Sequence, residues 1–594
     1  MTWEAAVTLG VLTVLLVALM REWSGPDVLL AAAAVGLAAI GEFAGSSRLP
    51  TIAETVAAMG NPGLATVGVL FVVVAGLTHT RAMQRVAGGL IGAPRTPRAA
   101  QLRLLTPVVG LSAFLNNTPV VAMFLPVVDE LSKRSRIAAS QLYMPMAFAA
   151  TFGGICTLIG TSTNVVVNGL WMKETGGPGL AMFDLAWVGV PGAAVGLVLM
   201  TWLAPRVLAD RKPAIDADSE RRQYFLDLVV TPGGRLVGKT VEQAGLRRLA
   251  QLFLVEVQRE GEVVGPVSSR FRLEAGDLLG FVGDVDAVRE LTGTAGLTAP
   301  PYSAHPTPRS RLIEAVVSPR CPLVGATIRD GQFRARYDAA VVAVARGAER
   351  LSGRLGDIVL GPGDTLLLEG GEDFVPRFGQ SHDFYLVSGI DGSDTPATSR
   401  APVAIGILLA MVAAATLGWC DLLTAGALAA AAMVVTGCCT VAQARASVEW
   451  PLLVAIAASL GIGLAMQTSG LADALAGGVI GIAGDSPWLA LAAVYVVTMV
   501  LTELVTNNAA AVLVYPLAMS TARSLNVSEI PFVVAVMVGA SAGFATPFGY
   551  QTNLMVYGPG GYKFADYLRM GVPLDLAFAV VTVGLAPVIF PFSP

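Results

Sequence analysis

Residues 108–128 read VVGLSAFLNNTPVVAMFLPVV, and the LNNTP at 115–119 interrupts an otherwise apolar run with two amides, a hydroxyl and a proline. Leaving such polar groups unpaired in hydrocarbon costs several kcal/mol. Irregular polar backbone is tolerated at membrane depth only where it is buried in protein or faces a water-filled cavity. The stretch therefore predicts a re-entrant hairpin, with two short helical arms joined at a polar tip.

The composition places this hairpin in a membrane protein. Of 594 residues, 54% are hydrophobic and 14% charged, and the mean hydropathy is +0.65. These values lie outside the soluble average and predict a polytopic α-helical membrane protein. The net charge of −4 gives no reason to expect a nucleic-acid partner. The five cysteines and three histidines lack metal or disulfide spacing, so we expect no cofactor.

The apolar sequence falls into two blocks that match each other. LNNTPVVAMFLP (115–126) aligns without gaps on VTNNAAAVLVYP (505–516), an offset of 505 − 115 = 390. GGICTLIGTSTN (153–164) aligns on AGFATPFGYQTN (542–553), an offset of 542 − 153 = 389. Each block then has three spans, one re-entrant hairpin and two spans, and this odd number of crossings inverts the second block. Inverted repeats mark secondary transporters, whose site lies between the repeats near the midplane.

Basic residues orient the predicted topology. They cluster on the flanks of the first hairpin, whereas the matching flanks of the second offer mainly Arg523. By the positive-inside rule the flanks of the first hairpin are cytoplasmic, and the charged middle segment lies inside as well. The residues used are Arg81, Arg85, Arg95, Arg98, Arg103, Lys133, Arg134, Arg136, Arg206, Arg211 and Lys212.

The charged middle segment is itself duplicated. LVGKTVEQAG (236–245) pairs with LVGATIRDGQ (323–332), and Asp277 and Asp364 show the same spacing of 364 − 277 = 87. Short alternating strands between turn signals predict two small α+β modules in tandem. The predicted domains are a first membrane repeat at 1–212, modules at 213–300 and 301–396, and a second membrane repeat at 397–594.

The first candidate site consists of the polar residues at the two hairpin tips. Amides and hydroxyls can bind the oxygens of an anion, and carbonyl oxygens can bind Na⁺. The competing interpretation is that the asparagines bond helix to helix as structural glue. Repetition at a fixed offset favours a substrate site. Tip 1 comprises Asn116, Asn117 and Thr118, and tip 2 comprises Thr506, Asn507 and Asn508.

A second polar cluster follows each hairpin, at 160–164 and 549–553. Glycine there breaks the helix and frees backbone carbonyls beside the tip, which adds Thr163 and Thr552 to the predicted substrate-binding residues. A kinked packing helix is the competing interpretation. Glu503 precedes Asn507 by four residues and is predicted as a proton site. The competing interpretation is that the hairpin arm ends close to the membrane–water interface, where water solvates Glu503. Neither tip carries Lys or Arg, which favours Na⁺ as counter-charge.

These tips and broken spans resemble the divalent anion:sodium symporter family of the ion transporter superfamily. The middle modules resemble paired TrkA-C (RCK C-terminal) domains. The resemblance implies anion and sodium contacts at both tips, with Asn117, Gly160, Asn507 and Gly549 as sodium ligands. It also implies a homodimer, an elevator motion and a small regulatory ligand on the modules. The chain departs from the family's Ser-Asn-Thr tip at Asn116, Thr506 and Asn508.

The sequence thus predicts a secondary active transporter in the cell membrane. It would import a small divalent anion, sulfate or dicarboxylate, together with Na⁺, under modulation by cytoplasmic modules. The alternative is a proton-coupled anion or metalloid exporter or antiporter of the same superfamily, in which Glu503 is essential. A channel needs a filter such as TVGYG, and an enzyme needs a nucleophile–base pair or a phosphate loop; the sequence shows neither pattern.

Overall fold

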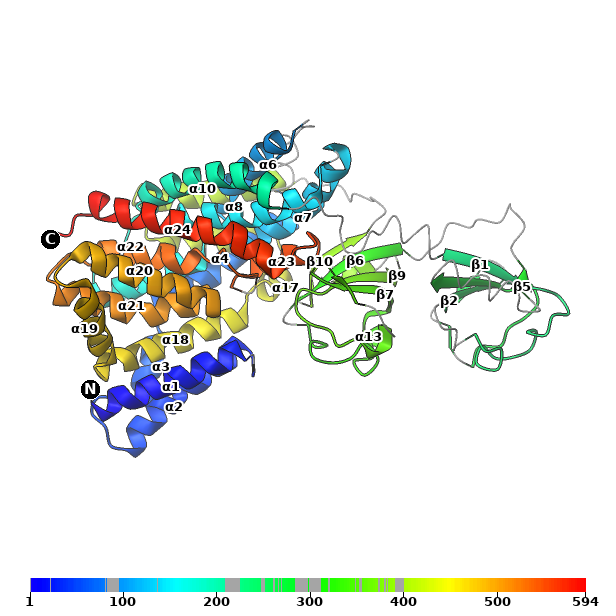
Figure 1. Cartoon of the computed structure of the whole chain (residues 1–594), viewed down its shortest axis with the longest axis horizontal. Coiled ribbons are helices and arrows are strands. Elements are labelled where there is room, and N and C mark those ends of the chain that lie inside the picture. Colours follow the sequence, from blue (N-terminus) through cyan, green and yellow to red (C-terminus); the bar gives the residue numbers. More distant parts are fainter. Residues whose placement is uncertain are drawn as a thin grey trace. The chain divides into compact units, whose positions relative to one another are not determined.

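The chain forms two compact units in a computed structural model (Figure 1). The helical unit comprises Met1–Arg211 and Thr395–Pro594, and the strand unit comprises Lys212–Asp394. The structure describes all residues except 1, 22, 81, 83–95, 136, 209–224, 247–251, 260–261, 265–266, 269, 284–296, 299–310, 319–320, 348, 352–354, 372–373, 379–380, 382, 390–399, 548 and 594. The predicted boundaries at 212, 300 and 396 lie outside the described residues, as do Arg81, Arg85, Arg95, Arg136, Arg211 and Lys212.

The helical unit divides at the strand unit into two halves. In the first half the helices are α1 (Trp3–Met20), α2 (Pro26–Phe43), α3 (Ile52–Met59), α4 (Pro62–His79), α6 (Pro97–Ser112), α7 (Asn117–Ser135), η1 (Ala139–Gln141), α8 (Tyr143–Ile155), α9 (Ser162–Thr175) and α10 (Ala186–Val207). In the second half they are α15 (Ala401–Thr416), α16 (Leu422–Val435), α17 (Val441–Ala446), α18 (Trp450–Thr468), α19 (Leu471–Ala483), α20 (Pro487–Leu504), α21 (Asn507–Ser524), α22 (Ile530–Ser541), α23 (Gln551–Tyr557) and α24 (Phe564–Ile589).

The described helices identify a polytopic membrane protein. Six of them, α2, α4, α10, α18, α20 and α24, are long and apolar enough to cross a membrane. Large apolar side chains are exposed on shorter helices too, including Val435 at 85% and Ile482 at 88%. A water-soluble surface rarely carries many such residues, so the expectation of a polytopic helical membrane protein is confirmed.

Local structure recurs between the two halves at the spacing seen in the sequence. Thr51 and Thr440, which are 440 − 51 = 389 apart, each begin a short helix, α3 and α17, with a capping box. In this arrangement the Thr side chain accepts from the backbone of the third helical residue, whose Glu or Gln side chain bonds back to the cap. The hydrophobic pattern predicts neither helix, because six to eight residues carry too little periodicity.

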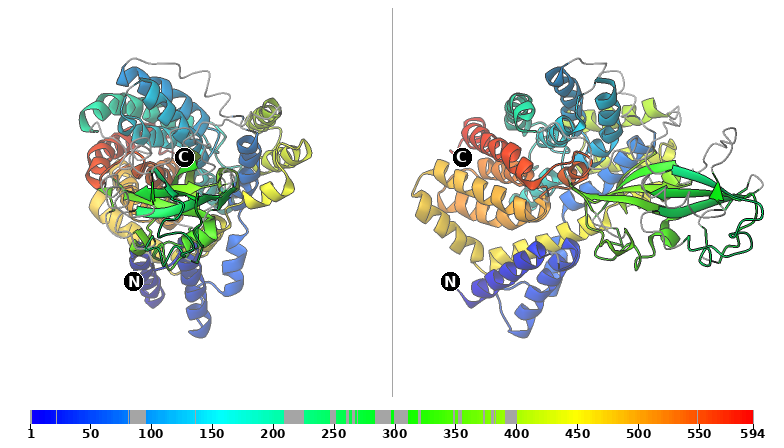
Figure 2. Two further views of the ribbon diagram at one scale, coloured as in Figure 1. Left: turned by 90° about the vertical axis from the view of Figure 1, so that its right-hand side faces the viewer. Right: turned by 45° about the vertical axis from the view of Figure 1, so that its right-hand side comes forward.

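The predicted hairpins have their breaks at the polar residues. In the first half α6 ends at Ser112 and α7 begins at Asn117; in the second, α20 ends at Leu504 and α21 begins at Asn507. Figure 1 shows α20 and α21 side by side in orange. Elsewhere in this unit α2 packs on both α1 and α18, as the blue and yellow helices in Figures 1 and 2 show.

The strand unit contains two five-stranded sheets of the same topology. Their orders are β3-β2-β4-β1-β5 and β10-β6-β9-β7-β8, with every pairing antiparallel. Read in reverse, the second order is the first with each strand moved 87 residues along the chain. The elements are β1 (Phe225–Val230), β2 (Leu252–Arg259), β3 (Glu262–Val264), β4 (Leu278–Gly283), β5 (Leu297–Thr298), β6 (Arg311–Val317), α13 (Phe333–Tyr337), β7 (Ala339–Arg346), β8 (Glu349–Arg350), η3 (Leu355–Asp357), β9 (Thr365–Gly370), α14 (Phe374–Phe378) and β10 (Phe384–Gly389).

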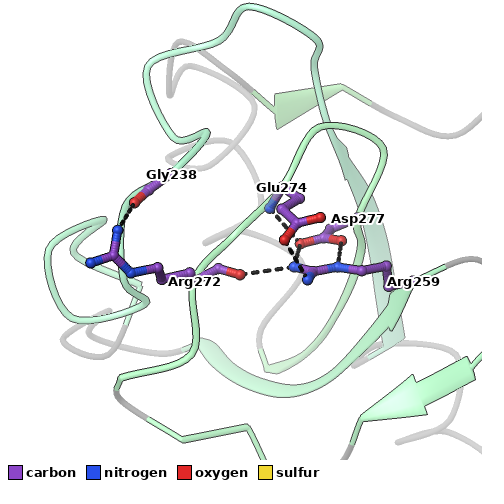
Figure 3. Close-up of polar contacts among 5 residues, drawn as sticks. All are labelled: Gly238, Arg259, Arg272, Glu274 and Asp277. Carbon is purple, nitrogen blue, oxygen red and sulfur yellow. Dashed lines mark hydrogen bonds and ion pairs between the residues drawn. The ribbon is translucent and has the colours of Figure 1, made fainter.

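A buried aspartate at the start of one strand anchors an arginine in each sheet. Figure 3 shows Arg259 held by Asp277 through two nitrogens, at 2.8 and 2.9 Å, while its third nitrogen meets Glu274. In the second sheet Arg346 binds Asp364 in the same way, at 2.7 and 2.8 Å. Both aspartates sit in the Gly-Asp turns of the duplicated sequence, so these turns have a structural use.

Loss of the Arg346–Asp364 ion pair, which we call the second clamp, is expected to destabilise the second sheet. Arg346→Ala should lower the opening free energy of β7 and β9 by about 1–3 kcal/mol, because Asp364 is fully buried and loses its charged partner. Native-state hydrogen exchange of these strands in the full chain measures the change. Arg329→Ala is the matched control: its ion pair with Asp357 is exposed, and such pairs contribute about 0–1 kcal/mol. Equal effects of the two substitutions would contradict the clamp.

Candidate functional site

Each hairpin tip is held to its own hairpin by a hydroxyl on the first arm. The Ser112 hydroxyl in α6 donates to Asn117 Oδ1 at 2.7 Å, and the Thr502 hydroxyl in α20 lies 3.0 Å from Asn507 Oδ1. The two pairs are related by the same offset, since 502 − 112 and 507 − 117 both equal 390. Asn117 and Asn507 are buried, at 1% and 5% exposure. Both asparagines therefore begin their helices inside the protein.

An unwound stretch interrupts the span after each hairpin, at 156–161 between α8 and α9 and, among the described residues of 542–550, at 542–547 and 549–550 between α22 and α23. In each case an asparagine in the first turn of the following helix stabilises the unwound stretch. Asn164 Nδ2 donates to the carbonyls of Gly154 and Thr157, at 3.2 and 3.0 Å. Asn553 Nδ2 donates to those of Gly543 and Thr546, at 3.0 and 3.1 Å.

These two asparagines each leave one buried atom unused. Asn164 Oδ1 and Asn553 Oδ1 are buried without a hydrogen-bond partner in the structure. An amide oxygen is a normal ligand for a hard cation, and a buried polar atom without a partner is costly unless something binds it. Each broken span therefore carries a matched oxygen that is free to take a cation or a water.

The unwound stretches require glycine where backbones approach. A methyl group on Gly160 would lie 2.7 Å from the Gly154 carbonyl oxygen, and one on Gly549 would lie 3.0 Å from a carboxylate oxygen of Glu503. Both distances are shorter than a normal carbon–oxygen contact. Gly160 thus lets the backbone approach Gly154, and Gly549 leaves room for the Glu503 and Thr546 side chains; both glycines lie in the predicted helix breaks.

Each tip contacts the broken span of the other half. Thr118 Oγ1 lies 3.5 Å from Gln551 Oε1, and Asn508 Nδ2 donates to Ser162 Oγ at 3.2 Å. These contacts are equivalent under the repeat, because 508 − 118 = 390 and 551 − 162 = 389. A third contact has no such counterpart: Asn117 Nδ2 donates to the Tyr550 hydroxyl at 2.7 Å. The hairpin tips and broken spans therefore form one polar cluster between the halves.

A small cavity of about 30 Å³ lies beside tip 1. Asn116 and Ser162 are its polar lining residues, and its other walls are apolar side chains of α4, α9, α15, the first unwound stretch and the residues just before the tip. Asn116 therefore borders a small cavity next to the polar cluster. The remaining lining residues are Val67, Leu70, Phe71, Val73, Val74, Phe114, Leu115, Ile159, Val165, Leu408 and Met411.

Glu503 lies at the last turn of α20, against the unwound stretch 542–550. One of its oxygens accepts the Ala545 amide at 2.8 Å, and the other is buried without a hydrogen-bond partner. Asp575 of α24 accepts the neighbouring Phe544 amide at 3.3 Å. Two carboxylates thus cap adjacent amides of the second broken span, and Ala113 stands at the position of Glu503 in the first half. Among the described residues neither carboxylate has an ion-pair partner.

The predicted site residues fall into three groups. Asn117, Thr118 and Asn508 lie in the cross-half contacts, and Asn507 borders them. Thr163 and Thr552 are buried in the first turns of α9 and α23, and the Thr552 hydroxyl has no partner in the structure. Thr506 is exposed and caps α21 without a side-chain bond.

The sequence prediction included the clusters at 160–164 and 549–553 but chose only their glycines and threonines Thr163 and Thr552 as site residues, so other residues of the polar cluster were not singled out. Ser162 and Gln551 occupy matched positions of the repeated motif and meet the opposite tips. Asn164 and Asn553 end the same motif and clamp the unwound stretches. Their repetition at one offset was the available signal. Tyr550 gave none, because Thr161 takes its place in the first half.

Apolar spans and a buried polar cluster between two matching halves are typical of polytopic membrane transporters. The family model described as citrate transporter matches residues 14–536. The chain belongs to this citrate transporter family. That assignment covers most of both halves and the strand unit between them.

Similar proteins carry transporter names. An uncharacterized transporter of Synechocystis sp. is 31% identical, over 100% of this chain and 98% of that protein. Sodium/sulfate cotransporter 1 of Chlamydomonas reinhardtii is 27% identical, over 98% and 89%. A sodium-dependent dicarboxylate transporter of Staphylococcus saprophyticus is 25% identical over 23% of this chain and 26% of that protein. The names of the cotransporter and of the dicarboxylate transporter support anion transport. They also support the expected resemblance to the divalent anion:sodium symporter family.

Proposed function

We propose that this protein is a secondary active transporter that imports a small divalent anion, sulfate or dicarboxylate, with Na⁺. The observation that carries the proposal is the pair of equivalent cross-half contacts, Thr118 with Gln551 and Asn508 with Ser162. They join each tip to the broken span of the other half. A solute held there contacts both halves at once, which is what alternating access requires.

The chemistry of the cluster fits an anion accompanied by a cation. Amide and hydroxyl groups of the six tip residues, Thr163 and Thr552 supply donors for the anion's oxygens. Among the described residues, no hydrogen bond of the tips involves Lys or Arg, which favours a cation from solution as the counter-charge of a dianion. Na⁺ supplies that charge, with ligands from Asn117, Gly160, Asn507 and Gly549, because a dianion without counter-charge is costly to desolvate.

The transport cycle follows from the repeat. We infer that the second half is inverted relative to the first, so that the two hairpins enter from opposite faces of the membrane. The hairpins and broken spans then move together as an elevator-type transport domain within a homodimer. The two sheets of the strand unit are TrkA-C-like modules that lie in the cytoplasm and bind a small regulatory ligand.

Uptake into proteoliposomes tests the proposal. Labelled sulfate and labelled succinate are each offered with an inward Na⁺ gradient and with the gradient replaced by K⁺. We expect Na⁺ to raise the uptake of at least one anion by about tenfold or more, and Asn507→Ala to remove that gain. Uptake that ignores Na⁺ would reject sodium coupling, and uptake that survives both Asn117→Ala and Asn507→Ala would reject the site.

The second candidate function is a proton-coupled exporter or antiporter for an anion or metalloid. The buried Glu503 oxygen without a partner favours it, since an intramembrane carboxyl group is a common proton carrier. The same vesicles decide between the two. A pH gradient that drives flux without Na⁺, and that fails in Glu503→Gln, would support the exporter.

A further inference from the structure

The two halves of the polar cluster differ in one hydrogen bond. Both polar atoms of the Asn117 amide have protein partners, the Ser112 hydroxyl and the Tyr550 hydroxyl, each at 2.7 Å. The Asn507 amide contacts only Thr502, and its Nδ2 is buried without a partner. Because Thr502 reaches one atom alone, one atom of the Asn507 amide stays free in either orientation of the group.

The difference has its origin in a single position of the repeat. Tyr550 and Thr161 correspond, since 550 − 161 = 389, and each is the residue before the helix that follows an unwound stretch. The tyrosine is long enough to meet Asn117 of the opposite half, whose Nδ2 donates to the phenol oxygen. Tyr550 therefore links tip 1 to the second broken span, to which it belongs.

Packing around the two asparagines differs in the same sense. A methyl group on Gly154 would lie 2.5 Å from Asn117 Oδ1, so the backbone of α8 encloses that amide. At the matched position, a methyl group on Gly543 would find its nearest atom at 3.5 Å, in Thr502. The backbone at position 543 therefore does not enclose the Asn507 amide as the backbone at position 154 encloses that of Asn117.

We propose that Tyr550 is a positioning residue that fixes tip 1 before any ligand binds, whereas tip 2 is completed by the transported ions, one of which contacts the free atom of the Asn507 amide. The part concerning tip 2 rests on the proposed function, because it takes those ions to be Na⁺ and a divalent anion. The part concerning tip 1 depends only on the protein. Loading is thus unequal: the ions order tip 2 against a tip 1 that is already in place.

Hydrogen–deuterium exchange of the full chain in detergent tests both parts. Peptides covering residues 113–120 and 505–512 report on the two tips. In the wild-type chain, Na⁺ with sulfate or succinate is expected to slow exchange at tip 2 by about fivefold or more, and to change tip 1 less than twofold. Without ligand, Tyr550→Phe is expected to speed exchange at tip 1 by about fivefold, as the loss of a buried hydrogen bond implies.

Tyr495→Phe is the matched control. Tyr495 is a fully buried tyrosine of α20 whose hydroxyl has no hydrogen-bond partner in the structure, so its loss should leave tip 1 unchanged. In transport, Tyr550→Phe should raise the apparent KM several-fold with the maximal rate kept within twofold, because ligand must then order both tips. A defect of packing alone would lower the amount of folded protein and leave KM unchanged.

The outcomes separate this inference from the proposed function. Equal protection of both tips by the ions, or unchanged tip 1 exchange in Tyr550→Phe, overturns the inference. A different result would contradict only the choice of ions: exchange at both tips is unchanged by Na⁺ and by both anions, yet Tyr550→Phe still speeds exchange at tip 1. That result would uphold the positioning role of Tyr550.

Discussion

Gly571→Ala is expected to cause a large loss of transport. An added methyl group on Gly571 of α24 would lie 2.0 Å from the Phe544 carbonyl oxygen and 2.6 Å from the Ala545 Cα. These atoms are backbone, so no side chain can turn aside to make room, and either α24 or the unwound stretch 542–550 must move. Overpacking of this kind costs about 1–3 kcal/mol or more. We expect uptake per folded protein to fall at least about tenfold.

The unwound stretch explains why function suffers more than folding. Its Ala545 amide binds Glu503 and its Gly543 carbonyl binds Asn553, so a displacement alters the second broken span directly. Gly584→Ala in the same helix is the control, because an added methyl group there meets nothing within 4 Å. Alanine is the better helix former by about 1 kcal/mol, so this variant should transport normally. Similar losses in both variants would mean that α24 simply tolerates no larger residue.

The sequence located the breaks of the membrane helices because polar residues and glycine are rare in apolar runs. Asn117 and Asn507 each begin a helix at the predicted tip, and Gly160 and Gly549 each lie in a predicted break. A residue that cannot be satisfied by lipid marks such a position wherever it occurs. Matching at one offset then related the two halves residue by residue.

The contacts across the halves were beyond the reach of the same reasoning. The bond from Asn117 to Tyr550 joins residues 433 apart, and no spacing in the sequence indicates it. The repeat also misled here, since it equates Tyr550 with Thr161, whose side chain is too short for the equivalent bond. The packing of the side chains, which the sequence pattern does not show, decides which tip asparagine has partners for both of its amide atoms. Features that break a repeat are therefore seen only when the repeats are folded together.

The local repeat at Thr51 and Thr440 shows a different limit. Both residues begin capping boxes of the pattern Thr-x-x-Glu or Thr-x-x-Gln, which a search for helix starts would have found. Apolar spans of about 20 residues do not reveal them, because α3 and α17 are too short. The signal was present in the sequence, at the same offset as the tips.

Asn553→Leu and Asn164→Leu are expected to reduce transport by about tenfold to 100-fold. Leucine resembles asparagine in size but cannot donate, so each variant leaves two carbonyls of an unwound stretch without their partner. A buried polar group without a partner costs about 1–3 kcal/mol, and two such groups favour rewinding of the stretch into a continuous helix. The change also removes the free Oδ1. Initial uptake rates per folded protein measure the effect.

Asn168→Leu separates the role of these clamps from a general need for buried amides. Asn168 also lies buried in α9, but its Oδ1 accepts from Leu180, outside the unwound stretch. Its loss leaves one amide without a partner and should lower stability by about 1–3 kcal/mol while keeping uptake within threefold. Normal uptake in Asn553→Leu would show that the second broken span keeps its shape without the clamp. Because the two clamps are equivalent under the repeat, a defect in only one variant would locate the ion-binding oxygen in that half.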